Sequence, residues 1–119
     1  MNDIDNILIK LQNSKFRNSF HLNNKMKEYV KERGLEVVRE HAFHFINERL
    51  KPKYIENDGK QTPMRQVHPV FIAQHACACC CRSCLYQWHH INKDKELTDK
   101  EVKYIVDLLM RWIEKEFTL

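Results

Sequence analysis

The chain has 119 residues, of which 43% are hydrophobic and 30% are charged, and its formal net charge at pH 7 is +4. These values are typical of a soluble globular domain and argue against disorder. No apolar run approaches the roughly 18 residues that a membrane-spanning helix needs. The acidic amino terminus also lacks the pattern of a secretory signal. We therefore expect one cytoplasmic domain over residues 1–119, with no membrane association and with flexibility allowed at 1–13.

The spacing of apolar residues predicts an all-α fold of four or five helices around a Cys/His-rich central segment. Gly34 marks the end of one helix, and Pro52 lies just beyond the end of the next. Thr98 and Glu101 form a capping-box pattern before the final helix. The predicted helical regions are residues 4–11, 23–34, 35–50, one or two helices within 69–90, and 98–117.

All five cysteines lie between Cys77 and Cys84. A disulfide framework would distribute cysteines along the chain, and thiols stay reduced in the cytosol. Clustering therefore indicates a metal site, redox chemistry or the packing of small polarizable side chains. Thiolate and imidazole ligands suit zinc, whereas iron or an iron–sulfur cluster is the less favoured cofactor.

A helical projection of this segment limits which residues can share one metal ion. At about 100° per residue, an unbroken helix places Cys77, Cys80, Cys81 and Cys84 within one sector roughly 100° wide, which also suits an ordinary buried face. The same projection turns His75 and His89 away from the thiols. These histidines can join the thiols only if the helix breaks near residues 76–80 and ends after residue 88.

The predicted metal site combines three thiols with two imidazoles. Cys84 is the first choice because it pairs with Cys81 at a Cys-x-x-Cys spacing and with Cys80 at helical spacing. Cys77 and Cys79 are expected to be spectators. The predicted ligands are His75, Cys80, Cys81, Cys84 and His89. Nitrogen donors from elsewhere in the chain remain the alternative, and these are His41, His44 and His68.

Three functions compete for this segment. The first is a zinc-stabilised module that recognises another macromolecule, because no phosphate-binding loop or nucleophile motif is present. The second is a metal-dependent hydrolase, such as an HNH-like nuclease, in which His89 and His90 act at the metal. The third is thiol redox chemistry, in which Arg82 lowers the pKa of a neighbouring thiol.

Basic residues are spread along the chain, which gives only weak support for binding nucleic acid. A polar loop that precedes the cysteines carries Lys60 and Arg65, and we expect these two residues to hold an anion over the site. The alternative for this loop is a solvated connection. The sequence leaves the partner, the oligomeric state and any catalytic activity open.

Several blocks of the sequence resemble a bacterial family of uncharacterised proteins, domain of unknown function 4186 (DUF4186). The similar blocks are Asn57–Arg65, His68–Ala76 and Cys80–Ile91, together with Leu97-Thr98 and Arg111–Glu114. The resemblance extends from about Ser14 to Glu116 and implies no particular activity or partner. Because relatives carry Thr in place of Cys77 and Cys79, it implies that Cys80, Cys81 and Cys84 are the thiols that matter.

Overall fold

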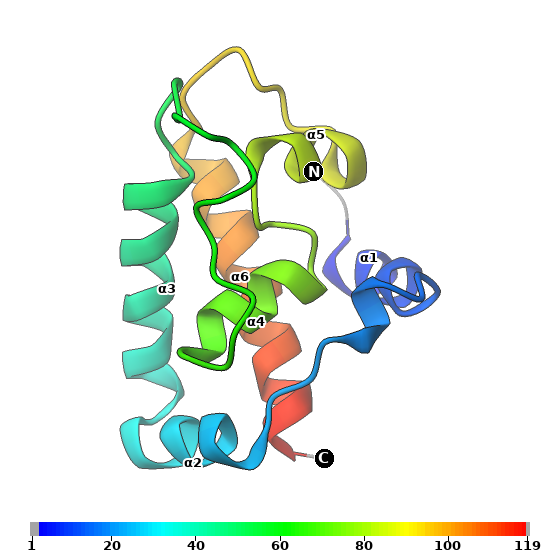
Figure 1. The fold of residues 1–119 in the computed structure, drawn as a ribbon, viewed down its shortest axis with the longest axis vertical. Helices are drawn as coiled ribbons and strands as arrows, with labels where there is room; N and C mark the ends of the chain where they lie inside the picture. Colours follow the sequence, from blue (N-terminus) through cyan, green and yellow to red (C-terminus); the bar gives the residue numbers. More distant parts are fainter. Residues whose placement is uncertain (1–2, 119) are drawn as a thin grey trace.

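The computed structural model describes residues 3–118 and is all-helical over that range (Figure 1). The elements are α1 (Ile4–Gln12), the short 3-10 helix η1 (Arg17–Ser19), α2 (Asn24–Arg33), α3 (Leu35–Arg49), α4 (Pro69–Ala76), α5 (Arg82–His89) and α6 (Asp99–Thr118). The predicted fold class is confirmed. The described residues form six α-helices rather than four or five, because residues 69–90 divide into α4 and α5.

Helix α6 is the longest element, and α1, α2, α3 and α4 all pack against it (Figure 1). Its start follows the predicted capping box. The Thr98 hydroxyl accepts from the Glu101 backbone N–H, and the Glu101 carboxylate accepts from the Thr98 N–H. The apolar stripe behind this cap is buried and includes Val102, Ile105, Val106, Leu109 and Ile113.

Helices α2 and α3 meet at Gly34, whose φ of 86° favours glycine. The Gly34 N–H donates to Val30 O and ends α2, as the sequence predicts. Helix α3 then lies along α6 and buries Val38, Ala42 and Ile46, which recur every four residues on one face.

Helix α1 lies on the opposite side of α6 from α3 (Figure 1). Asp3 caps it by accepting from the Asn6 N–H, and its buried residues are Ile7, Leu8 and Leu11. Most of the segment in which the sequence allowed flexibility is therefore a packed helix. Residues 1–2 of that segment lie outside the described part of the chain.

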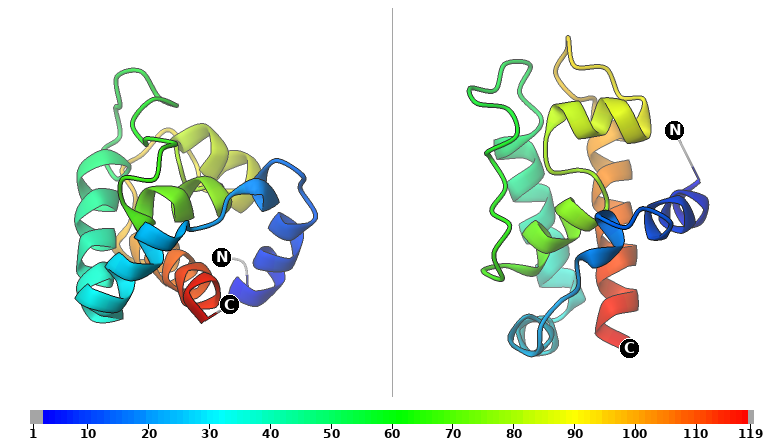
Figure 2. Two further views of the ribbon diagram at one scale, coloured as in Figure 1. Left: turned by 60° about the horizontal axis from the view of Figure 1, so that its bottom comes forward. Right: turned by 45° about the vertical axis from the view of Figure 1, so that its right-hand side comes forward.

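The break between α4 and α5 positions the site. Helix α4 ends at Ala76, and Ala78 adopts the left-handed conformation with φ of 56°. The Cys79 N–H donates to Gln74 O at 2.8 Å, and this hydrogen bond closes the turn. Residues 77–81, the linker, then carry the chain to α5, which lies above α4 in the right-hand view of Figure 2.

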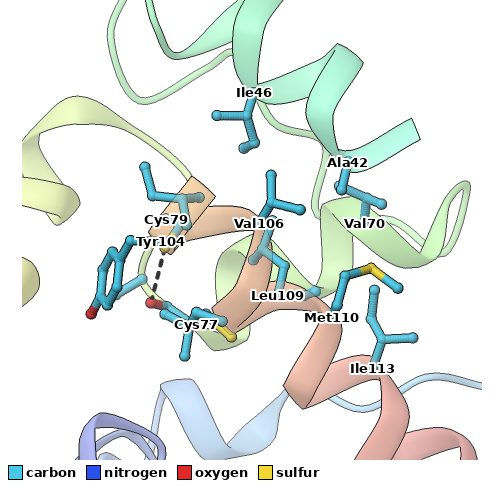
Figure 3. Packing of buried hydrophobic residues seen from close by; sticks show 14 of the residues in the cluster. Ala42, Ile46, Val70, Cys77, Cys79, Tyr104, Val106, Leu109, Met110 and Ile113 are labelled. Atoms are coloured by element: carbon cyan, nitrogen blue, oxygen red, sulfur yellow. Dashed lines mark hydrogen bonds between the residues drawn. The ribbon is translucent and has the colours of Figure 1, made fainter. Parts of the chain in front are cut away.

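Cys77 and Cys79 point into the hydrophobic core and have no exposed surface. Figure 3 shows them among core side chains of α3, α4 and α6. They pack as small apolar groups, and burial raises the pKa of both thiols.

None of the helices in residues 3–118 combines the length and the apolar character that a membrane span requires.

Candidate metal centre

Three thiols meet where the linker joins α5. The sulfur atoms of Cys80, Cys81 and Cys84 all lie within 4.8 Å of one another. The Cys81 Sγ is 3.3 Å from the Cys84 Sγ, and the Cys80 Sγ is 3.6 Å from it. Cys80 and Cys81 are buried, whereas Cys84 is partly exposed. The break after α4 brings Cys80 beside Cys81 and Cys84 at the start of α5. These three cysteines are three of the five predicted metal ligands.

Arg17 provides a positive charge beside these sulfurs from η1, more than 60 residues away in the sequence. Its Nη1 donates to His75 O at 2.7 Å and to the Cys80 Sγ at 3.6 Å. Its Nη2 donates to the Cys84 Sγ at 3.2 Å. Arg17 is only 7% exposed, so little water screens its charge from the sulfurs.

The amino terminus of α5 also faces the thiols. Cys81 is the N-cap, and its sulfur accepts from the Cys84 N–H at 3.4 Å. Asp58, from the predicted turn at residues 57–59, accepts from the backbone N–H groups of Arg82 and Ser83 at 2.9 and 3.2 Å. These bonds anchor the loop between α3 and α4 to the first turn of α5. The Asp58 carboxylate thereby satisfies N–H groups that have no partner within the helix.

Hydrogen bonds link the three thiols electrostatically and favour negative charge on Cys84 over Cys80 and Cys81. Hydrogen bonds from Cys80, Cys81 and Arg17 lower the pKa of the Cys84 thiol. The hydrogen bonds with Cys80 and Cys84 raise the pKa of Cys81. For Cys80, the bond with Cys81 lowers the pKa, but the bond with Cys84 and burial raise it overall. The cluster therefore favours one thiolate that accepts hydrogen bonds from two thiols.

Buried polar residues from two other segments hold the linker in place. The Thr62 hydroxyl donates to Cys80 O at 2.9 Å, and the Gln74 amide donates to Cys79 O at 3.0 Å. Both side chains are almost fully buried. Because these bonds satisfy two of the linker carbonyls, they help an irregular segment to lie inside the protein.

The two predicted nitrogen donors do not join the three thiols within 4.8 Å. Burial lowers the pKa of both, so each imidazole is neutral at pH 7. The His75 Nε2 donates to Thr62 O at 3.0 Å, which leaves the lone pair on Nδ1. His89 uses both nitrogens, because Nε2 donates to Cys77 O and Nδ1 accepts from the Tyr104 hydroxyl, each at 2.8 Å. His75 thus retains a lone pair that His89 does not.

The alternative nitrogen donors lie outside the thiol group. His44 pairs with Glu48 on the exposed face of α3. The His41 Nδ1 lies 3.0 Å from the His68 Nε2, and the His68 Nδ1 accepts from the Val70 N–H as the cap of α4. His44 therefore contacts Glu48, His68 caps α4, and His41 contacts His68.

The predicted anion-binding residues, Lys60 and Arg65, are both exposed on the loop before α4. Their binding of an anion stays a prediction. Arg82 differs from the expectation that it acts on a neighbouring thiol. Its guanidinium is buried and donates to the carbonyls of Leu50, Pro52, Asn92 and Lys95. Arg17 is the arginine that donates to the sulfurs.

Sequence reasoning missed Arg17 and Thr62 and took Asp58 only as part of a turn. Asp58 gave a partial signal, because an Asn-Asp-Gly turn can present its carboxylate to nearby N–H groups. Arg17 gave none, since its contacts with Cys80 and Cys84 span 63 and 67 residues. Only the packing of η1 against α4 brings it to the site.

A family model described as a domain of unknown function (DUF4186) matches residues 5–114. The chain belongs to this family. No solved structure matches it. The three-thiol group, with its arginine and its helix amino terminus, is therefore the main guide to what this DUF4186 protein does.

Proposed function

We propose that this DUF4186 protein binds one zinc ion through the thiolates of Cys80, Cys81 and Cys84. The observation that carries the proposal is the convergence of the three sulfurs within 4.8 Å. Tetrahedral zinc with Zn–S bonds of about 2.3 Å requires sulfur atoms about 3.8 Å apart. The separations of 3.3 and 3.6 Å need to widen by only a few tenths of an ångström.

Charge supports the same proposal. Three thiolates exceed the charge of one Zn²⁺ ion by one unit, and a buried excess charge is costly unless it is compensated. Arg17 supplies the opposite unit charge through its bonds to Cys80 and Cys84. The amino terminus of α5 adds N–H groups and the positive end of the helix dipole. A divalent ion bound by these thiolates would thus be balanced by groups already in place.

His75 or a water molecule would occupy the fourth coordination position of the zinc ion. His75 suits a ligand role because its Nε2 bond to Thr62 O fixes the tautomer that leaves a lone pair on Nδ1. His89 is disfavoured because both of its nitrogens already have partners. A zinc ion would also hold the linker to α5, and to α4 where His75 is the fourth ligand, and so stabilise the fold as structural zinc does in small domains.

An HNH-like nuclease is less well supported. Its site needs a β-hairpin, and residues 3–118 contain no strand. His89 is buried and engaged, and His90 is the left-handed residue that ends α5. A role in recognising another macromolecule remains part of the proposal, with the metal centre as a structural element.

Elemental analysis of the purified protein tests the metal proposal. We expect about one zinc per chain in the wild type and little in Cys84→Ser, whereas Cys77→Ala serves as a matched control that keeps the metal. Replacing zinc with cobalt should give the sulfur-to-cobalt absorption of three thiolates in tetrahedral geometry. His75→Ala distinguishes a nitrogen ligand from water through the cobalt spectrum. A wild-type protein that neither contains zinc nor takes it up would refute the proposal.

A further inference from the structure

The spacing of two sulfurs suggests a reaction beyond metal binding. We propose that a hydroperoxide oxidises Cys84 and Cys81 to a disulfide within the same chain, which makes this pair a modification site that a dithiol can reverse. Release of zinc by this reaction rests on the proposed function, because it removes two of the three thiolates. Formation of the disulfide itself does not depend on the metal.

The sulfurs of Cys81 and Cys84 are already in van der Waals contact. They lie 3.3 Å apart, and the bond between the Cys84 N–H and the Cys81 Sγ holds them on the same side of the first turn of α5. A disulfide has a sulfur separation of about 2.05 Å, so small side-chain rotations suffice to form one.

Cys84 is the sulfur that a hydroperoxide reaches first. It is the only one of the five cysteines that is not buried, and it lies between Cys80 and Cys81. The Arg17 guanidinium donates to it at 3.2 Å and would stabilise negative charge there. Cys77 and Cys79 have no exposed surface and are protected from the reagent.

The reaction has two balanced steps. The Cys84 thiolate attacks the terminal oxygen of the hydroperoxide, the O–O bond breaks, and the protein is left with a sulfenic acid while an alcohol or water departs. The Cys81 sulfur then attacks the Cys84 sulfur, the S–O bond breaks, and the departing hydroxide takes up the Cys81 thiol proton and leaves as water. Overall, two thiols and one hydroperoxide give a disulfide, one water and one alcohol or second water. A dithiol reverses the change and is itself oxidised to a disulfide.

The geometry favours Cys81 over Cys80 as the partner of Cys84. The Cys80 Sγ is more distant, at 3.6 Å, and it receives a hydrogen bond from Arg17. Cys81 has no such bond from Arg17 and is held by the Cys84 N–H. After oxidation, Cys80 would be the one remaining thiol of the centre, which is too few ligands for tight zinc binding.

Tryptic peptide mapping gives a direct readout, because Arg82 lies between the two cysteines. Cleavage after Arg65, Arg82 and Lys93 places Cys81 in peptide 66–82 and Cys84 in peptide 83–93. After treatment with hydrogen peroxide and alkylation of free thiols, we expect these peptides to be joined and to separate on reduction. With Cys77, Cys79 and Cys80 alkylated under denaturing conditions, the mass of the joined pair should equal the sum of the two peptides plus three alkyl modifications and minus two hydrogen atoms.

Variants assign the partner within peptide 66–82. Cys81→Ser keeps an N-cap side chain for α5 and should abolish the joined peptides, whereas Cys80→Ser should retain them. Cys81→Ala provides a second test if the serine variant folds poorly, with the fold of each variant checked by circular dichroism. An undiminished yield of joined peptides in both Cys81 variants would overturn the assignment. Oxidation of wild-type Cys84 to sulfinic acid without joining would do the same.

Running the experiment on metal-free and zinc-loaded protein separates the two proposals. Zinc release is followed with a chromogenic chelator and should parallel the appearance of the joined peptides. If zinc never binds but the joined peptides form, the metal proposal fails and the disulfide stands. If zinc binds but peroxide joins the peptides in neither form, the disulfide proposal fails alone.

Discussion

Replacing Arg82 with methionine is expected to destabilise the protein more than any exposed arginine variant. Arg82 is 3% exposed, and its guanidinium donates to four backbone carbonyls from two loops, at distances of 2.7 to 3.2 Å. Methionine fills a similar volume but donates nothing. The variant therefore leaves the carbonyls that follow α3 and those that precede α6 without their common donor.

The size of the effect follows from the burial of those bonds. The bond to Leu50 O is buried, and an unsatisfied buried acceptor costs about 1–3 kcal/mol. The other three bonds are partly buried, so water can replace the donor at a cost of about 0.5 kcal/mol each. Burial desolvates the Arg82 charge and lowers the pKa of Arg82. Removing this charge removes the desolvation cost and offsets part of the loss in stability. We expect a net loss of about 2–3 kcal/mol.

Urea denaturation followed by far-ultraviolet circular dichroism measures this loss, with stability compared at an unchanged m-value. Arg82→Lys keeps the charge and should lose roughly half as much, because one ammonium cannot span both loops. Arg111→Met is the matched control, since Arg111 is 45% exposed and only forms surface ion pairs, and it should change stability by less than about 0.5 kcal/mol. A loss below about 1 kcal/mol for Arg82→Met would contradict this account of the four bonds.

Two further predictions concern the half-buried His68 and the left-handed residue in the linker. Burial and the neighbouring His41 lower the pKa of His68 from 6.5 to about 4, so its stabilising contribution is present above pH 6.5 and lost as the pH falls towards 4. His68→Asn can still accept from the Val70 N–H and should reduce the loss of stability between pH 7 and pH 5 in urea titrations; an unchanged loss would count against this role. For Ala78, with φ of 56° and no exposed surface, Ala78→Gly should stay within about 1 kcal/mol of the wild type, because relief of strain offsets the lost methyl group. Ala78→Val should lose at least about 2 kcal/mol in thermal melts, and equal stabilities of the two variants would exclude strain at this position.

Local signals in the sequence determined most of the fold. Gly34 ends α2 because glycine accepts a positive φ, and Thr98 with Glu101 begins α6 because each side chain caps the backbone of the other. The apolar stripes of α3 and α6 follow the helical period, which also fixes the faces that they bury. The grouping of Cys80, Cys81 and Cys84 was within reach for the same reason, since all three are neighbours in the sequence.

Only the tertiary structure decided how the segment 69–90 breaks and what surrounds the thiols. Neither glycine nor proline marks the turn at Ala78, which is held by Thr62, Gln74 and the core that buries Cys77 and Cys79. The orientation of His75 depends on Thr62, and the charge beside the sulfurs comes from Arg17. Because such long-range contacts form only when distant helices pack, neither periodicity nor spacing within the cysteine segment could predict them.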